Sequence, residues 1–451
     1  MSAVGWQPVL LWTDALVWGL ALAVLGLALG LRRSGAARET WGRIVGRPLG
    51  AASAVVLAAY AGVGLADSVH LRGPDGAVLS VLDLALTPLR THVEKTYSAP
   101  FALRQLSGEM VQRPDGRVER VRPRLRFGGA HLRDEAGRAA DIARRGGLGA
   151  AAGLAAGALA LLPAAWAQRG RRWSAAARAG AATWLALGVL AGAVAALAPH
   201  YHVLGTDKVG EDVLYQALKG VRTGLVIGTL TTLVMLPFAV ALGTAAGYFG
   251  GRVDDLVQYT YTTLSSIPGV LLIAAAVLML QVYMGTHPEA FPTNEARADA
   301  RLLFLCVILG VTSWTHLCRL LRGEALKLRE LDYVAAARAQ GAGHLRILAR
   351  HVVPNVWHIV LITVVLDFSG LVLAEAVLSY VGVGVDPTME SWGNMINGAR
   401  LELAREPVVW WSLAASFLFM FGLVLAANVF ADHVRDALDP RLRAGLAGGS
   451  G

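Results

Sequence analysis

Charged residues are scarce in this chain. They make up 16% of its 451 residues, whereas hydrophobic residues make up 55%. A typical soluble domain has about 25% charged residues. The composition is therefore typical of a polytopic membrane protein, whose length is used for membrane spans rather than for one large soluble core.

Cysteine and lysine are also scarce. Cys306 and Cys318 are the two cysteines, and both fall in one apolar run, which argues against a disulfide framework or a zinc site. The four lysines complete no GxxxxGK[ST] motif, so no phosphate-binding loop is predicted. HExxH, GxSxG and a catalytic carboxylate pair are missing as well, so we predict no catalytic residue.

Two features could suggest other ligands. The net charge of +9 could indicate nucleic acid, but much of the arginine flanks apolar runs, where it reports membrane orientation. His200 and His202 could bind a metal, but without a third ligand an interfacial loop is the favoured interpretation. We predict neither a nucleic-acid partner nor a metal site.

Nine apolar runs have roughly the 20 residues that are needed to cross about 30 Å of hydrocarbon. They lie at 9–31, 48–66, 147–167, 179–198, 222–249, 259–284, 301–321, 356–384 and 409–430. The first run is long for the apolar segment of a removable signal and lacks a basic segment before it, so we expect a retained span.

Basic loops predict the orientation. Arginine is concentrated in 32–47, 169–178 and 319–350, which fall on one side if every run spans. That side is expected to be cytoplasmic, with the N-terminus outside and the C-terminus inside. Arg144 and Arg145 disagree, but they adjoin a loop of nearly 80 residues, where the charge rule is weak.

That long loop, 67–146, is predicted to form a small extracytoplasmic insertion. It contains Pro-Asp-Gly turns at 74–76 and 114–116, and the alternating run RVERVRPRLRF at 117–127 indicates a strand or hairpin. The basic run could form a patch for an anionic partner, but a solvated strand face is the favoured interpretation.

Glycines recur at i,i+4 in the third and fourth runs. They are Gly149, Gly153 and Gly157 in one and Gly188 and Gly192 in the other. This spacing lets transmembrane helices approach closely, so the two runs are predicted to pack as a hairpin.

The stretch 332–355, DYVAAARAQGAGHLRILARHVVPN, has more order than a loop between two spans needs. Asp332 can cap a small-residue helix at 333–340, and Gly341 then breaks it. Pro354 is expected to stop the loop before the next span.

A second short helix is predicted at 344–351 within this stretch. It places Leu345 and Leu348 on one face, with Ile347 beside them, and Arg346 and Arg350 on another. Two short helices hinged at a glycine would suit docking in a groove of a partner protein. The alternative is a merely positive cytoplasmic loop.

This stretch resembles the EAA loop of binding-protein-dependent ABC-transporter permeases, in the dipeptide, oligopeptide and nickel branch. One departure is Ala335, where the family usually has glutamate. The matching positions are Asp332, Tyr333, Ala336, Ala337, Arg338, Gly341, Ala342, Arg346, Ile347, Arg350, His351, Pro354 and Asn355.

Three further stretches resemble the same family, so that the resemblance covers about 200–443. Residues 373–395 include Glu375 and the Ser391 to Asn394 run, and 435–443 resemble the family's cytoplasmic end. Residues 204–228 resemble its signature before the second core helix, although Glu211 replaces the usual arginine. The matching signature positions include Gly205, Thr206, Asp207, Gly210, Asp212 and Arg222.

The resemblance implies an all-α permease subunit of a type I ABC importer, with an extended N-terminal half. The path would carry peptides or peptide-like solutes, and an extracytoplasmic binding protein would deliver them. A second, distinct permease and two ATPases would complete the assembly in a bacterial inner membrane. ATP and Mg would bind to the ATPases and no cofactor to this chain, while its coupling loop, 324–355, would transmit their motion.

The expected domains follow the order of the chain. They are N-terminal helices at 1–66, the insertion at 67–146, an inserted hairpin at 147–199, the permease core at 200–443 and a flexible tail at 444–451.

Ionisable residues inside spans are costly and often functional. Asp367 could line the path and meet the amino group of a peptide, or it could be a buried carboxyl bonded to a serine or threonine. Glu375 is expected to have a structural or gating role. Pro237 and Pro268 are predicted to kink their helices.

Other functions were weighed against the importer. A secondary transporter needs coupling-ion groups near the midplane and often inverted repeats, and neither is clear here. A membrane-embedded enzyme lacks a recognisable catalytic pattern. A nickel or other small-solute permease of the same branch stays an alternative for the substrate.

Overall fold

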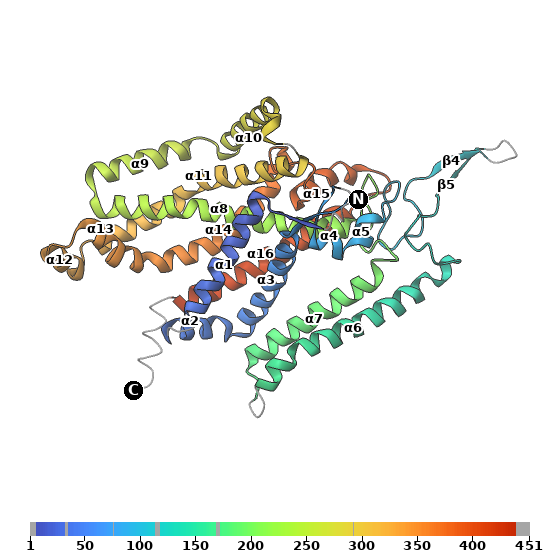
Figure 1. The fold of residues 1–451 in the computed structure, drawn as a ribbon, viewed down its shortest axis with the longest axis horizontal. Helices are drawn as coiled ribbons and strands as arrows, with labels where there is room; N and C mark the ends of the chain where they lie inside the picture. The colour runs from blue at the N-terminus through green and yellow to red at the C-terminus, as the bar shows by residue number, and fades with distance from the viewer. Residues whose placement is uncertain are drawn as a thin grey trace. The chain divides into compact units, whose positions relative to one another are not determined.

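A computed structural model describes residues 6–31, 35–74, 76–112, 118–167, 172–291 and 293–438. Within those residues, nine helices are long and apolar enough to cross a membrane, as the nine runs predict (Figure 1). Some features of the sequence lie outside the described residues: Arg32, Arg33, the turn at 114–116, Arg169, Arg171, residues 439–443 and the tail predicted at 444–451.

Several long helices extend beyond the apolar runs that predict them at one or both ends, because flanking polar residues continue the helical hydrogen bonding. α11, for example, begins seven residues early, where the Thr293 hydroxyl accepts a hydrogen bond from the Ala296 amide at 3.1 Å. The long helices are α1 (Trp12–Leu31), α3 (Pro48–Asp67), α6 (Arg138–Ala167), α7 (Ala175–Leu197), α8 (Val213–Phe249), α10 (Gly269–Thr286), α11 (Asn294–Leu328), α14 (Val353–Val381) and α16 (Trp411–Leu438).

Shorter helices lie between the spans. They are α2 (Gly35–Val45), α4 (Val81–Ala85), α5 (Thr87–Thr91), α9 (Gly251–Ser266), α12 (Asp332–Ala339), α13 (His344–Ile347) and α15 (Trp392–Ala399).

The sixth run is divided, which corrects the prediction for Pro268. α9 ends at Ser266, and Pro268 precedes α10 instead of kinking one continuous helix. Proline disfavours the helical conformation in the residue before it, and Ile267 is extended, with φ −86° and ψ 129°. Pro237, in contrast, lies inside α8, and the kink expected there stays a prediction.

The chain divides into two compact units that are discontinuous in sequence. The first unit comprises residues 1–10, 45–224 and 389–426, and the second comprises 11–44, 225–388 and 427–451.

The first unit contains two small antiparallel sheets. One has the order β1 (Gln7–Val9), β2 (His70–Arg72) and β3 (Val78–Ser80), with Pro8 opposite Leu71 and His70 opposite Ser80. The other is a hairpin of β4 (Glu109–Gln112) and β5 (Val118–Val121). β5 confirms the strand predicted in 117–127, although the strand is only four residues long.

The helical hairpin of the first unit is formed by α6 and α7, as predicted (Figure 1). Its glycines lie where the two backbones meet. A Cβ atom added to Gly153 would lie 2.0 Å from the carbonyl oxygen of Gly188, and one on Gly149 would lie 2.3 Å from that of Gly192. Any larger side chain would push these helices apart.

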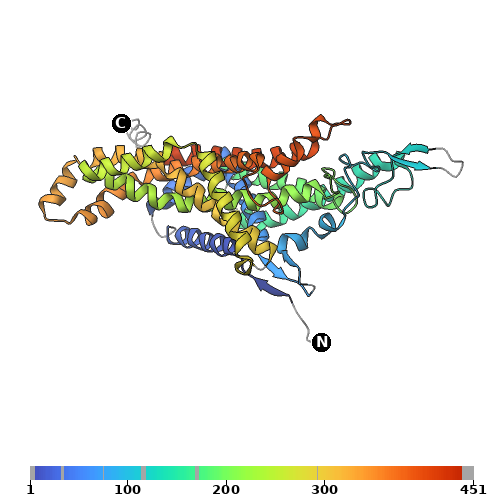
Figure 2. The same ribbon diagram turned by 90° about the horizontal axis from the view of Figure 1, so that it is seen from above.

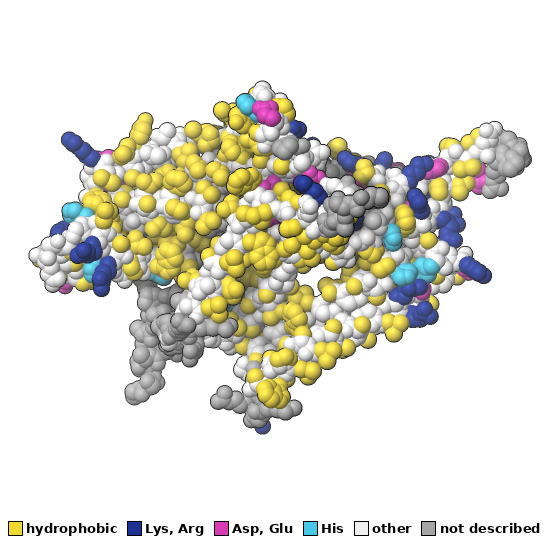
Figure 3. All heavy atoms as spheres, in the orientation of Figure 1, with side chains coloured by type: hydrophobic (Ala, Val, Ile, Leu, Met, Phe, Trp, Pro, Cys, Tyr) yellow, Lys and Arg dark blue, Asp and Glu magenta, His cyan; other side chains and the backbone are white. Residues whose placement is uncertain are grey.

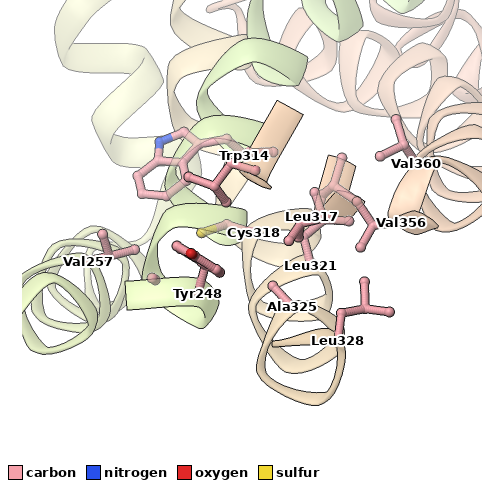
Figure 4. Packing of buried hydrophobic residues seen from close by; sticks show 14 of the residues in the cluster. Tyr248, Val257, Trp314, Leu317, Cys318, Leu321, Ala325, Leu328, Val356 and Val360 are labelled. Carbon is pink, nitrogen blue, oxygen red and sulfur yellow. The ribbon is translucent and has the colours of Figure 1, made fainter. Parts of the chain in front are cut away.

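The core of the second unit joins α8, α11 and α14. Trp314, Leu317 and Leu321 of α11 are buried with Tyr248 of α8 and Val356 of α14 (Figure 4). Both cysteines are buried in α11 and free.

Large apolar side chains remain exposed along the long helices. Leu27 of α1 and Leu278 of α10 are 65% and 55% exposed, and Figure 3 shows hydrophobic side chains spread over the helical surfaces. Such surfaces are too apolar for water and fit contact with lipid or with other membrane subunits.

Candidate functional site

The loop between α11 and α14 holds the stretch 332–355, for which two short helices are predicted. It contains α12, a turn at Gly341, α13 and one wide π-helical segment, Leu348–Val352, which leads into α14 (Figures 1 and 2). Gly341 has a φ of +80°, a conformation that favours glycine. The amide of Ala342 donates to the carbonyl of Ala337 at 3.1 Å, which closes the end of α12.

Two buried side chains anchor this loop to the second unit. Val334 of α12 and Ile347 of α13 are 0% exposed and belong to the same hydrophobic cluster as the ends of α8 and α11. Ala337 and Ala342 pack against that cluster. Each short helix is therefore held by its own anchor in the core.

Polar contacts add to these anchors on both sides of the loop. The Tyr248 hydroxyl lies 3.0 Å from Nδ1 of His344, and the Arg338 guanidinium lies 5.7 Å from the Tyr248 ring centroid. On the other side, Nδ2 of Asn355 donates to the Tyr333 hydroxyl at 3.2 Å. The loop is thus fixed before any partner binds.

The exposed face of α12 is smooth. Ala335, Ala336 and Ala339 are exposed, and none of them carries atoms beyond Cβ. Arg346 and Arg350, which were predicted to share a face, are also exposed. Figure 3 shows basic side chains gathered near α12 and α13. The surface combines small side chains with a basic margin.

Asp332 does not cap α12 as predicted. Leu331 is the N-cap residue, it makes no side-chain capping bond, and Asp332 is the first helical residue. Its carboxylate still lies in the first turn, where negative charge is favoured by the helix dipole.

The second short helix also differs from the prediction. Leu345 is 80% exposed, whereas Leu348 is buried next to Ile347, so the two leucines do not share a face. Pro354 does not stop the helix, which continues into α14. Proline removes one amide donor, and the wide turn before it accommodates that loss.

Asp367 lines a pocket of about 340 Å³ within the second unit. Among the described residues no serine or threonine hydroxyl bonds to its carboxylate, and the side chain is half-buried. The pocket is otherwise mostly apolar. Its lining residues are His316, Leu320, Ile359, Ile362, Thr363, Leu366, Asp367 and Arg435.

Glu375 lies two turns further along α14 in a different environment. It is 1% exposed and accepts a hydrogen bond from the Ser379 hydroxyl at 2.8 Å. Asp367 and Glu375 therefore differ in exposure, and Glu375 is part of the packed interior of the second unit.

The signature loop before α8 belongs to the first unit and is held by its own side chains. Asp207 accepts from the amides of Val209 and Glu211, each at 2.9 Å. Asp212 accepts from the Leu214 amide at 2.9 Å, where α8 begins. Gly205 has a φ of +74°.

The same loop is bound to the insertion. The buried Thr206 hydroxyl donates to the Thr96 carbonyl at 3.0 Å and accepts from the Ser98 amide at 2.7 Å. Nε of Arg222 lies 3.2 Å from the Ser68 hydroxyl. The sequence gives no signal for this pairing, because the partners lie more than 100 residues apart.

His202 joins the two segments through a buried ion cluster. Its Nδ1 lies 2.8 Å from Asp212, and its Nε2 lies 3.4 Å from Glu94. Burial lowers the pKa of His202, but its hydrogen bonds to these carboxylates outweigh burial and raise it to about 9. Burial likewise raises the pKa of Glu94, but hydrogen bonds from His202 and from backbone amides lower it to about 2.

His200 is not part of this cluster. It contacts Arg145 at 2.9 Å, and burial together with that positive charge lowers its pKa. Among the described residues no group of three or more His, Cys, Asp or Glu side chains has an arrangement that could hold a metal ion.

Comparison with known proteins decides the family. Residues 239–444, which include the anchored loop, match the family of binding-protein-dependent transport system inner membrane components. The oligopeptide permease OppC of Mycobacterium tuberculosis is 32% identical over 242 residues, 54% of this chain and 77% of that protein. The chain belongs to this permease family.

Other relatives agree. The dipeptide permease DppC of Bacillus subtilis is 29% identical, and the glutathione permease GsiD of Pectobacterium atrosepticum is 32% identical. Each alignment covers 54% of this chain, and 69% and 73% of the relative, respectively. The chain is thus a multi-pass permease subunit of an ABC importer system, of a family whose permease subunits are normally non-catalytic. Residues 1–238 lie outside the family match.

Proposed function

We propose that the chain and a second, distinct permease form the path of an ATP-driven importer of peptides or peptide-like solutes in a bacterial inner membrane. The anchored α12–α13 loop carries this proposal. Its buried Val334 and Ile347 would transmit motion to α8, α11 and α14, while the exposed alanines of α12 fit a partner's groove.

The other parts of the assembly follow from the same proposal. Two ATPase subunits bind ATP and Mg and dock beneath the loop on the cytoplasmic side, so this chain needs no cofactor of its own. An extracytoplasmic binding protein delivers the solute on the side of the insertion, 67–146. The N-terminus is outside and the C-terminus is cytoplasmic, as the basic loops indicate. The domain boundaries predicted from the sequence stay part of this proposal.

Asp367 is proposed to contact the translocated solute. Its carboxylate lines a mostly apolar pocket together with His316 and Arg435. A carboxylate in such a place would attract the ammonium group of a peptide. Glu375, which is buried and bonded to Ser379, is proposed to hold the end of α14 or to take part in gating. Pro237 would allow α8 to bend.

The coupling role is tested by copurification. The tagged chain is solubilised from native membranes in three forms: wild type, Ala336→Trp and Ala290→Trp. Ala336 is on the exposed face of α12. Ala290 is also exposed, but it lies just before the first residue of α11, at the end opposite to the loop. Because α11 has 35 residues, it is roughly 50 Å long and separates Ala290 from the loop.

We expect the ATPases and a second permease to copurify with the wild type and with Ala290→Trp. The ATPases alone should be lost from Ala336→Trp. A wild type that comes out of the membrane without partners would refute the importer assembly and would favour a secondary transporter. ATPases that remain bound to Ala336→Trp would refute the docking role of α12.

A further inference from the structure

A second pocket, of about 480 Å³, lies in the first unit between the insertion and the segment that joins α15 to α16. Its volume is within the range of small-molecule sites, about 300–1,000 Å³. The lining residues are Tyr97, Leu106, Ser107, Gly108, Arg120, Arg122, Arg405, Glu406 and Pro407. No part of the function proposed above uses this pocket.

Three arginines line the pocket from two segments. Arg120 of β5 and Arg122 just after it point to one side, since side chains two residues apart along an extended strand share a face. Arg405 comes from the segment before α16. The three positive charges meet one negative charge, Glu406, so the lining is positive overall.

The backbone around these arginines is firmly held. The Leu106 amide donates to the Tyr97 carbonyl at 3.0 Å. The Arg122 carbonyl accepts from Arg104, whose Nε pairs with Glu135 at 2.5 Å. The side of the pocket that the insertion forms is therefore preformed.

Gly108 makes room for Arg120. A Cβ atom at this position would lie 2.7 Å from Cγ of Arg120, so the arginine stem lies directly across the glycine backbone. Any side chain at Gly108 would displace Arg120. The absence of a side chain at Gly108 thus sets the direction of the Arg120 guanidinium.

Arg405 is oriented as well. Its guanidinium lies 5.1 Å from the centroid of the buried Tyr97 ring, and its Nη1 lies 3.2 Å from Glu402. Because Arg405 is already paired with Glu402, the charge of Arg120 and Arg122 is what the pocket offers most directly to a ligand.

We propose that this pocket binds the carboxylate of a small solute. Arginine is the side chain best suited to hold a carboxylate through paired N–H donors. Glu406 in the same lining could meet an ammonium group, so a short zwitterionic peptide fits both charges. The choice of a peptide rests on the proposed function, whereas the carboxylate chemistry does not.

The test measures binding by the full-length chain, purified alone in an uncharged detergent. The probes are triglycine and triglycine amide, which differ only in the carboxylate, and binding is followed by equilibrium dialysis at low salt. Arg120→Gln/Arg122→Gln removes the two charges. Arg133→Gln is the matched control, an exposed arginine of the same insertion that does not line the pocket.

We expect saturable binding of triglycine, weaker binding of the amide, and about a five- to tenfold loss of triglycine affinity in the double variant. The control should keep the wild-type affinity, and size-exclusion profiles should be unchanged. If the double variant does not fold, Gly108→Ala, which keeps every charge but displaces Arg120, should also weaken triglycine binding.

Three results would overturn the proposal: no saturable binding, equal affinity for the acid and the amide, or an equal loss in Arg133→Gln. A partner-free chain is used, so these results are independent of ATPase docking. Failure of the copurification test would leave this pocket intact, and failure here would leave the importer assembly intact.

Discussion

Replacing His202 should change how the stability of the chain depends on pH. The side chain is 4% exposed and lies between Glu94 and Asp212, with His92 as a further titratable neighbour. His202→Gln retains a similar size but cannot carry the positive charge that both carboxylates contact. The ion cluster connects the signature loop to the insertion, so its loss should loosen that connection.

The magnitude follows from the raised pKa of His202. A rise from the ordinary value of 6.5 to about 9 corresponds to about 3 kcal/mol of extra stability when the histidine is protonated. The lowered pKa of Glu94 reports the same interaction and is not added. Because the folded pKa is raised, this stability is fully present below pH 6.5 and is lost as the pH rises toward 9.

The assay is the apparent melting temperature of the purified chain between pH 6 and pH 9.5. The melting temperature of the wild type should fall as the pH rises across this range. His202→Gln should have a lower melting temperature than the wild type at pH 6, and this temperature should fall less as the pH rises. His200→Gln is the control: its pKa is lowered, not raised, so this variant should keep the wild-type loss at high pH. An equal loss in wild type and His202→Gln would refute the role of the cluster.

Three further predictions concern packing and the path. Gly153→Leu should lower the free energy of unfolding by about 3 kcal/mol or more, because its Cβ would lie 2.0 Å from the Gly188 carbonyl oxygen. Gly147→Leu is the control in the same thermal unfolding assay: its Cβ would meet no atom within 4 Å, so the free energy of unfolding should change by no more than about 0.5 kcal/mol. Val334→Ala should lower the free energy of unfolding by about 2 kcal/mol, because it removes two buried methyl groups. It should also speed hydrogen exchange of the α12 amides, and an unchanged exchange rate would contradict the anchoring role of Val334. Asp367→Asn should change peptide uptake without changing the amount of the protein in the membrane. A fall in that amount would instead indicate a structural role for Asp367.

The spans and the helical hairpin could be predicted because each depends on local sequence. A run of about 20 apolar residues has few alternatives to a membrane helix. The glycines at 149, 153, 188 and 192 likewise need no distant information, since any two helices with small residues at i,i+4 can approach closely. Gly341 was recognisable as a break for a similar reason, because positive φ favours glycine.

The errors arose where helical phase or a distant partner decides the structure. The sequence predicts that Leu345 and Leu348 share a face, on the assumption of 3.6 residues per turn, but a π-helical segment begins at Leu348 and changes the helical phase. Leu348 is buried beside Ile347, whereas Leu345 is exposed. β1 has only three residues beside an apolar run, and its partner β2 lies some 60 residues away. No local pattern could reveal such a pairing.

The exposed face of α12 shows why one departure from the family pattern leaves the fold intact. Ala335 replaces the family's usual glutamate, and this position is exposed on α12. Arg338, one turn later, stacks on Tyr248, while Val334 and Ile347 provide the buried anchors. The loop therefore holds its shape without a carboxylate at position 335, and under the proposed docking the loss of that charge would bear on how the loop meets an ATPase. With a neutral residue there, shape and the basic residues beside α12 would have to provide the specificity of the proposed docking.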